Sequence, residues 1–264
     1  MSFKFIFIEY GNKEVYFKEL QYALLTLKAH QHLMASDVCV YTENVERYAN
    51  IPVTPISIKS EISEYSLNER YHFRIKPMVI RRALFDHQES SKGLFFLDTD
   101  TYITTSLSKR LDEIKNQTIL MNQFERLNPY SSSRLENLLL PSGLTYSYTP
   151  KACMFNSGVL GILREHEPIL ADAVAIIDGM LDAGFQAHTV EQCAVSEAFR
   201  IHGVQIKEVK KEVVHYWHGS DKRYMHKKLN AYFAGTMTAS MFSMPLVKIP
   251  HSWWRARLDK FIHA

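Results

Sequence analysis

Short apolar runs alternate with longer stretches of helical periodicity throughout the N-terminal half of the chain. The apolar runs predict strands at residues 3–8, 37–41 and 53–58. Residues 13–31, between the first two of these strands, repeat their apolar residues at helical spacing and predict a helix. A second helix is predicted at 76–85, after the third strand, because Lys76-Pro77 suits the first turn of a helix. Strands that alternate with helices are typical of β-α-β units around a largely parallel sheet, so the pattern predicts an α/β fold.

One predicted strand is apolar without interruption. Residues 93–97 read Gly-Leu-Phe-Phe-Leu and end at Asp98, as expected for a central strand that is buried on both faces. Ligands of parallel sheets bind at the carboxyl ends of the strands. We therefore expect a functional site at Asp98 and the residues that follow it.

The C-terminal half continues the pattern with shorter elements. Apolar runs predict four more strands, at 118–121, 154–163, 204–206 and 212–214. Helical periodicity predicts two helices, at 168–181 and 190–199, and residues 131–140 fit either a short helix or a loop. Because no linker interrupts the chain, we expect one domain over 1–247 and a short appendage over 248–264.

The composition is that of a globular protein. The chain has 264 residues, of which 46% are hydrophobic and 22% charged, so it can bury a large core and is not disordered. Its apolar N-terminal run is too short for a signal peptide, and we expect a cytoplasmic protein. Cys39, Cys153 and Cys193 lie far apart in apolar segments, which predicts reduced core thiols and neither a disulfide framework nor a zinc site.

The charge is distributed unevenly along the chain. The net charge is +3, but from residue 201 onward eight lysines and three arginines face two aspartates and two glutamates, a surplus of +7. A basic C-terminal quarter suits an anionic partner such as a nucleotide diphosphate or a phospholipid surface, and an ordinary solvated surface explains it equally well. No nucleic-acid-binding module is recognisable, so we expect no nucleic-acid partner.

Aromatic and basic residues are interleaved in the tail at 249–262. This composition suits peripheral contact with a membrane interface, which for a cytoplasmic protein is the inner face. The alternative is a C-terminal helix that packs Trp254, Leu258 and Phe261 onto the domain, because these residues recur at helical spacing.

The most informative motif is Asp98-Thr99-Asp100, directly after the apolar strand. Two carboxylates one residue apart repel each other unless they are neutralised, and hard oxygen ligands suit Mg²⁺ or Mn²⁺. The alternative is a pair of turn or helix-capping aspartates.

A second motif follows the last predicted strand. Residues 213–222 place His215, His218, Gly219 and Lys222 close together in the sequence. An imidazole can complete a metal shell and favours Mn²⁺ over Mg²⁺. A glycine lets phosphate oxygens approach the backbone, and a lysine supplies them with a positive charge.

The order of these motifs resembles that of retaining glycosyltransferases of family 8, which include glycogenin-like and bacterial lipopolysaccharide galactosyltransferase-like enzymes. Four segments carry the resemblance: Arg74-Ile75-Lys76, Leu94 to Asp100, Phe155-Asn156-Ser157-Gly158-Val159, and Glu191-Gln192 with the His215 cluster behind it. The resemblance implies a GT-A fold, a Rossmann-like and mainly parallel mixed sheet flanked by helices. It also implies a metal-dependent transferase that uses a nucleotide-sugar donor, with UDP as the expected nucleotide, and a glycan, lipid-linked or protein acceptor.

The resemblance also implies roles for individual residues. Asp98, Asp100 and His215 would bind the metal. The family usually reads His-x-x-Gly-x-x-Lys, whereas here three residues separate His215 from Gly219, so His218 is an alternative ligand or a phosphate contact. Donor contacts would come from Tyr10, Gly11, Thr42, Arg74, Lys76, Thr99, His218, Gly219 and Lys222. Gln192, Glu191 and Asn156 would lie beside the donor sugar and act in catalysis, with a glutamate at 191 where the family usually has aspartate.

Three other functions fit parts of the same pattern. Asp98-Thr99-Asp100-Thr101 satisfies the signature of haloacid-dehalogenase-like phosphatases, in which the first aspartate is a nucleophile. Those enzymes begin with this motif, whereas here nearly 100 residues precede it. A nucleotidyltransferase would be expected to carry a glycine-rich, basic phosphate loop after the first strand, and this chain has none. A non-enzymatic glycan or nucleotide binder on the same scaffold is the remaining alternative.

Overall fold

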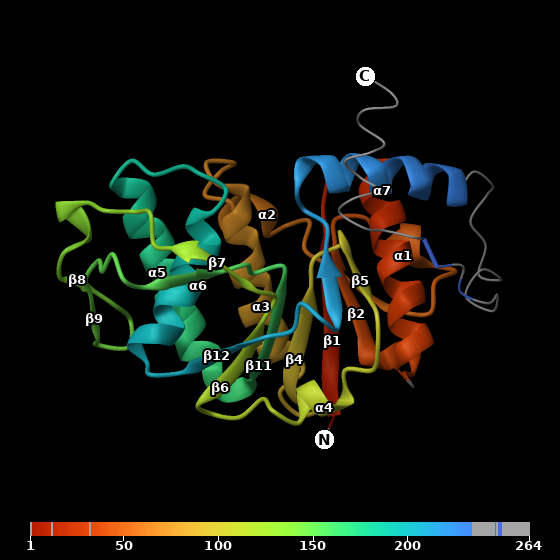
Figure 1. The fold of residues 1–264 in the computed structure, drawn as a ribbon, viewed down its shortest axis with the longest axis horizontal. Coiled ribbons are helices and arrows are strands. Elements are labelled where there is room, and N and C mark those ends of the chain that lie inside the picture. Colours follow the sequence, from red (N-terminus) through yellow and green to blue (C-terminus); the bar gives the residue numbers. More distant parts are fainter. Residues whose placement is uncertain (1, 12, 32, 234–245, 247, 250–264) are drawn as a thin grey trace. The chain divides into compact units, whose positions relative to one another are not determined.

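The computed structural model describes residues 2–11, 13–31, 33–233, 246 and 248–249 (Figure 1). The expected appendage at 248–264 and its helix through Trp254, Leu258 and Phe261 lie outside these residues, apart from 248 and 249. Within the described part of the chain, no helix combines the length and the apolarity that crossing a membrane requires.

Seven strands form a mixed, mainly parallel sheet in the order β12-β6-β11-β4-β1-β2-β3. Their bounds are β12 (Gln205–Glu208), β6 (Thr118–Met121), β11 (Val159–Leu163), β4 (Ser91–Leu97), β1 (Ser2–Glu9), β2 (Val38–Thr42) and β3 (Thr54–Ser57). Strands β2 and β3 pair in parallel, as do β12 and β6, whereas β11 and β6 are antiparallel. The predicted α/β class is confirmed, and the predicted strand at 118–121 coincides with β6.

The chain divides into two compact units. The first unit comprises Met1–Ile6, Ile58–Phe96 and Ser108–Val209, and the second comprises Phe7–Ser57, Leu97–Leu107 and Lys210–Ala264. We refer to them as the first and second units.

Helices of the first unit pack around apolar faces. They are α2 (Ile62–Tyr65), α3 (Ile75–Asp86), α4 (Ser108–Leu111), α5 (Glu167–Asp182) and α6 (Val190–Ile201). Helix α5 packs against both α3 and α6, and the side chains of Val79, Ile177 and Ala194 in these helices are fully buried. The helices predicted at 76–85, 168–181 and 190–199 are confirmed as α3, α5 and α6, each slightly longer than predicted.

Two small antiparallel sheets also belong to the first unit: β7 (Phe124–Leu127) with β10 (Cys153–Phe155), and β8 (Leu138–Leu139) with β9 (Thr145–Tyr146). The single strand predicted at 154–163 is therefore wrong, because β10 and β11 lie in different sheets. Asn156 interrupts the run: its side-chain oxygen accepts a hydrogen bond from the Gly158 amide at 2.9 Å, which competes with strand pairing. Cys153, expected in the core, is exposed on β10, whereas Cys39 and Cys193 are buried as predicted, and none of these three residues forms a disulfide.

The second unit holds α1 (Glu14–His30), α7 (Gly219–Tyr232), β5 (Thr101–Ile103) and β13 (Val213–His215). Helix α1 packs against β5 and against α7, and Figure 1 shows α1 and α7 as neighbouring helices of this unit. The sequence pattern does not predict α7, because only Tyr224, Met225 and Leu229 of its fourteen residues are buried. Short 3₁₀ helices occur at Ala35–Asp37, Val45–Tyr48, His72–Arg74, Ser133–Leu135 and Arg164–His166.

Candidate metal centre

Strand β4 delivers two aspartates to the second unit. The strand ends at the buried Leu97, and the chain turns through Asp98, Thr99 and Asp100 before β5 begins at Thr101. The Thr101 hydroxyl donates a hydrogen bond to the Asp98 carbonyl oxygen at 2.7 Å, which closes the turn. Asp98 remains partly exposed, whereas Asp100 is only 7% exposed.

Strand pairing places His215 beside these carboxylates. Strand β13 runs antiparallel to β5, so that His215 lies opposite Thr101. The Tyr216 amide then donates a hydrogen bond to the Asp100 carbonyl oxygen at 3.1 Å, which continues the contact past the end of β13. The position of the histidine therefore depends on β5, a three-residue strand that the sequence pattern did not predict.

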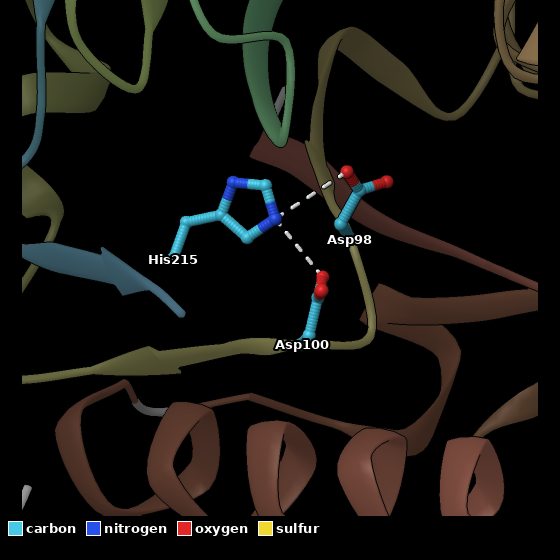
Figure 2. Close-up of side chains that lie close together, drawn as sticks. All are labelled: Asp98, Asp100 and His215. Atoms are coloured by element: carbon cyan, nitrogen blue, oxygen red, sulfur yellow. Dashed lines mark hydrogen bonds and ion pairs between the residues drawn. The ribbon is translucent and has the colours of Figure 1, made fainter. Parts of the chain in front are cut away.

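The three side chains converge on a small volume (Figure 2). Nε2 of His215 lies 3.0 Å from Oδ1 of Asp100 and 3.8 Å from Oδ2 of Asp98. One potential ligand atom from each residue lies within 4.8 Å of the others. Two carboxylate oxygens and one imidazole nitrogen form a donor set that suits a divalent cation such as Mn²⁺.

Lys222, in the first turn of α7, contacts the carboxylate oxygen of Asp100 that His215 does not contact. Its Nζ lies 2.7 Å from Oδ2 of Asp100. Burial acts to raise the pKa of the Asp100 carboxyl, but the charges and hydrogen bonds of His215 and Lys222 outweigh burial and hold that pKa well below its ordinary value. Burial acts to lower the pKa of Lys222, but Asp100 and Glu19 raise it to about 12.

The second histidine of the motif is placed differently. His218 is exposed and precedes α7 as its N-cap residue, and its Nδ1 lies 3.2 Å from the Ser220 hydroxyl. It is not part of the Asp98, Asp100 and His215 cluster. Gly219 begins the helix, and a Cβ at this position would meet only the end of the Arg223 side chain, at 3.6 Å.

A buried carboxylate that the sequence pattern did not reveal lies close to Lys222. Glu19 of α1 has no exposed surface, and its Oε1 lies 3.8 Å from Nζ of Lys222 and 2.7 Å from Nε2 of His226. Burial is the largest influence on the Glu19 carboxyl and raises its pKa, which the hydrogen bond from His226 only partly offsets.

Three of the predicted donor contacts, Tyr10, Gly11 and Thr42, lie near the ends of β1 and β2. Gly11 is exposed, and its amide donates a hydrogen bond to Glu43 at 2.6 Å, while Tyr10 is partly buried. Thr42 is fully buried, and its hydroxyl donates to Glu9 at 2.9 Å and accepts from the Asn44 amide at 3.1 Å. The Thr42 side chain therefore faces the protein interior, where its hydroxyl links Glu9 to the Asn44 amide.

In the first unit, two of the predicted sugar-contacting residues share one carboxylate. The side-chain amides of Asn156 and Gln192 donate hydrogen bonds to the two oxygens of Glu125, at 2.8 Å and 2.6 Å. Glu125 lies on β7, a strand that the sequence pattern missed, and is only partly buried. We call Glu125, Asn156 and Gln192 the amide–carboxylate cluster.

The remaining predicted residues of the first unit form two ion pairs. Glu191 is buried and accepts a hydrogen bond from the Ser157 hydroxyl at 2.7 Å, and Nζ of Lys76 lies 3.5 Å from the same carboxylate. The Arg74 guanidinium donates two parallel hydrogen bonds to Asp178, at 2.8 Å and 3.0 Å, and its third nitrogen donates to the carbonyl oxygens of Glu64 and Tyr65. Arg74 thus ties the start of α3 to α5.

Comparison with known proteins finds only a weak structural similarity. No protein-family model and no curated protein matches this chain. A solved structure is similar: the apo form of mouse xyloside xylosyltransferase 1, with 12% sequence identity and a TM-score of 0.47. The match covers 79% of this chain and 85% of that chain. At this identity and TM-score the likeness assigns neither a function nor a site residue to the chain.

The side chains gathered in the second unit suit a divalent cation that in turn binds an anion. Asp98 and Asp100 supply negative charge at the end of a buried strand, and His215 supplies a nitrogen donor from a separate strand. Lys222 adds a permanent positive charge within hydrogen-bonding distance of this group, and the amino end of α7 presents backbone amides that have no partner within the helix.

Proposed function

We propose that this protein is a metal-dependent glycosyltransferase that transfers a sugar from a nucleotide-diphosphate sugar, with UDP as the nucleotide. The observation that carries the proposal is the convergence of Asp98, Asp100 and His215, because 115 residues separate His215 from Asp100 and yet the two side chains are 3.0 Å apart. Adjacent carboxylates at the end of a buried strand gain most from a bound cation that neutralises them.

The residues present fit a divalent cation. Carboxylate oxygens suit both Mg²⁺ and Mn²⁺, and the imidazole nitrogen of His215 favours Mn²⁺. A cation bound here would supply positive charge to the diphosphate leaving group. We assign its ligands to Asp98, Asp100 and His215, in preference to the exposed His218.

Lys222 and the amino end of α7 supply further positive potential for a diphosphate. The Lys222 ammonium would neutralise phosphate oxygens as a point charge, and the amides of Gly219 and Ser220 would donate hydrogen bonds to them. The absence of a side chain at Gly219 leaves the backbone open to close approach. Thr99, between the two aspartates, is assigned to the same diphosphate, and Tyr10 with Gly11 to the base.

For the first unit we propose a separate role, which is recognition of the donor sugar. The amide–carboxylate cluster presents the side-chain types that bind sugar hydroxyls, and Glu125 fixes the orientation of Asn156 and Gln192. Glu191 and Lys76 support these residues from the same unit through Ser157. Transfer would retain the anomeric configuration, with the leaving phosphate oxygen accepting the proton of the acceptor, so no carboxylate base is required.

The test is a panel of nucleotide sugars assayed for release of the nucleoside diphosphate, with Mn²⁺ and after chelation. We expect Mn²⁺-dependent release that the Asp98→Asn/Asp100→Asn double variant loses. Asp112→Asn serves as the matched control, because Asp112 is an exposed aspartate directly after α4. Undiminished turnover in the double variant would refute the proposal. Hydrolysis of a simple phosphate ester that Asp98→Asn abolishes would instead establish the phosphatase alternative.

A further inference from the structure

Four side chains, alternately acidic and basic, follow one another from Asp100 across the contact between α7 and α1. Asp100 contacts Lys222 at 2.7 Å, Lys222 lies 3.8 Å from Glu19, and Glu19 contacts His226 at 2.7 Å. Lys222 and His226 are one helical turn apart on α7, so both face the same carboxylate of α1. The proposed binding of the diphosphate does not use Glu19 or His226.

A buried glutamate at position 19 is unfavourable for the stability of the folded protein. Its side chain has no exposed surface, and its Oε2 has no hydrogen-bond partner within the described part of the chain, although Oε1 accepts from His226. A buried carboxylate oxygen that forms no hydrogen bond costs free energy that an apolar side chain at the same position would not. The cost is reasonable if the carboxylate gains a second charged partner in another state of the site.

Lys222 is the partner that such a state would supply. Its ammonium bonds to Oδ2 of Asp100, while His215 bonds to Oδ1 of the same carboxylate. A divalent cation bound by Asp100 would place two more positive charges close to the ammonium, and like charges at such distances repel strongly in a partly buried site. Lys222 must therefore leave Asp100 when a cation binds there.

Glu19 is an acidic group close enough to receive the ammonium. A shift of about 1 Å would bring Nζ of Lys222 from its present 3.8 Å into hydrogen-bonding distance of Oε1 of Glu19. The lysine would then keep a charged partner instead of becoming a buried, unpaired cation. His226 holds the Glu19 carboxylate in place for this exchange through the hydrogen bond to Oε1.

We propose that Glu19 is a positioning residue that receives the ammonium of Lys222 when a divalent cation binds at Asp100. Lys222 is then an internal cation that occupies part of the metal site until the metal displaces it, and Glu19 lowers the free energy of that displacement. The inference rests on the proposed metal site and goes beyond it, because it predicts an energetic coupling between two residues that do not bind the metal.

The experiment measures Mn²⁺ affinity without any nucleotide, by electron paramagnetic resonance of free Mn²⁺ during titration of the metal-free protein. Four proteins are compared: the wild type, Glu19→Gln, Lys222→Met, and the double variant. Lys222→Met should bind Mn²⁺ about tenfold more tightly because its competitor is gone, and Glu19→Gln about tenfold more weakly because the displaced lysine has lost its acceptor. In the Lys222→Met background, Glu19→Gln should change the affinity by less than about twofold, since no lysine remains to be accepted.

The matched control is Glu113→Gln, which removes a carboxylate of the first unit that is paired with a lysine, Lys207 at 3.0 Å. It should leave Mn²⁺ affinity unchanged. Thermal melts of the metal-free proteins check folding, and if Glu19→Gln does not fold, Glu19→Asp replaces it, because the shorter side chain withdraws the carboxylate from Lys222.

Two results would overturn the inference while leaving the proposed function intact. One is wild-type binding of Mn²⁺ that Lys222→Met fails to tighten, and the other is an equal effect of Glu19→Gln with and without Lys222. A wild-type protein that binds no Mn²⁺ would overturn the inference and the proposed metal site together.

Discussion

The imidazole of His215 lies 3.0 Å from the carboxylate of Asp100, although β13 and the end of β4 are far apart in the sequence. The pairing of β13 with β5 produces this contact, because it sets His215 opposite Thr101, the residue next to Asp100. The candidate metal centre therefore depends on a two-stranded sheet of six residues, and α1 packs against β5 of that sheet.

Mn²⁺ should stabilise the folded protein. A ligand that binds only the native state adds about 2.7 kcal/mol at a concentration 100 times its Kd, which corresponds to a rise in Tm of roughly 5–10 °C for a chain of this size. Thermal unfolding with increasing Mn²⁺ should show this rise in the wild type and in Asp112→Asn, and no rise in the Asp98→Asn/Asp100→Asn variant. An equal rise in all three proteins would indicate that the cation binds elsewhere.

Gly219→Ala should separate folding from nucleotide binding. A Cβ at this position meets only the end of Arg223 at 3.6 Å, and alanine favours a helix more than glycine does, so Tm should stay the same or increase. If phosphate oxygens approach the backbone at Gly219, the added methyl group should weaken the binding of UDP with Mn²⁺ about tenfold or more. Calorimetric titration measures the affinity, and unchanged UDP binding would remove Gly219 from the proposed site.

Glu125→Gln should impair turnover of the nucleotide sugar and leave UDP binding unaltered. The substitution keeps the shape of the side chain but puts an amide where the amides of Asn156 and Gln192 now donate, so at least one of the two hydrogen bonds is lost. We expect a decrease in kcat/KM of about 10²-fold, in line with the loss of a charged hydrogen-bond acceptor in a site. Glu136→Gln, at an exposed position of the same unit, is the matched control. Equal kcat/KM for both variants would show that the cluster has only a structural role.

The buried carboxyl of Glu19 predicts a pH dependence of stability with a definite sign. Because burial raises its pKa above the ordinary 4.5, the folded state binds the proton more tightly than the unfolded state does. Its contribution to stability is therefore largest below pH 4.5 and is lost as the pH rises through the raised value. Since the amide of the Glu19→Gln variant cannot titrate, the wild type should lose stability relative to that variant as the pH rises above 4.5. Urea unfolding of both proteins across this range measures the difference, and a wild type that gains relative stability would contradict the assignment.

Much of the fold follows from local pattern. The run at 93–97 is buried on both faces as β4, and the helical periodicity of 13–31 gives α1, because each signal lies within one element and needs no distant partner. The alternation of strands and helices likewise predicts the α/β class. The break at Asn156 was missed because it depends on a hydrogen bond between a side chain and the backbone, which hydropathy does not encode.

The candidate site is less local, and the sequence predicts it less completely. Asp98 and Asp100 are predicted from their residue types, and His215, with His218 as the alternative, from the family resemblance. The strand that brings His215 to the two aspartates, β5, has only three residues and no clear pattern. Glu19 was missed because a carboxylate in a helix is normally solvated, whereas here it is buried and contacts Lys222 and His226 of α7. Glu125 was missed because β7 has only four residues, and its sequence, Phe-Glu-Arg-Leu, does not alternate apolar and polar positions.

The most direct test of the account is the electron spin echo spectrum of bound Mn²⁺, which detects a nitrogen ligand through its coupling to the metal. We expect coupling to one imidazole nitrogen in the wild type, retention of this signal in His218→Gln, and its loss in His215→Gln. A spectrum without nitrogen coupling, or a coupling that survives in His215→Gln, would contradict the claim that Asp98, Asp100 and His215 hold one cation.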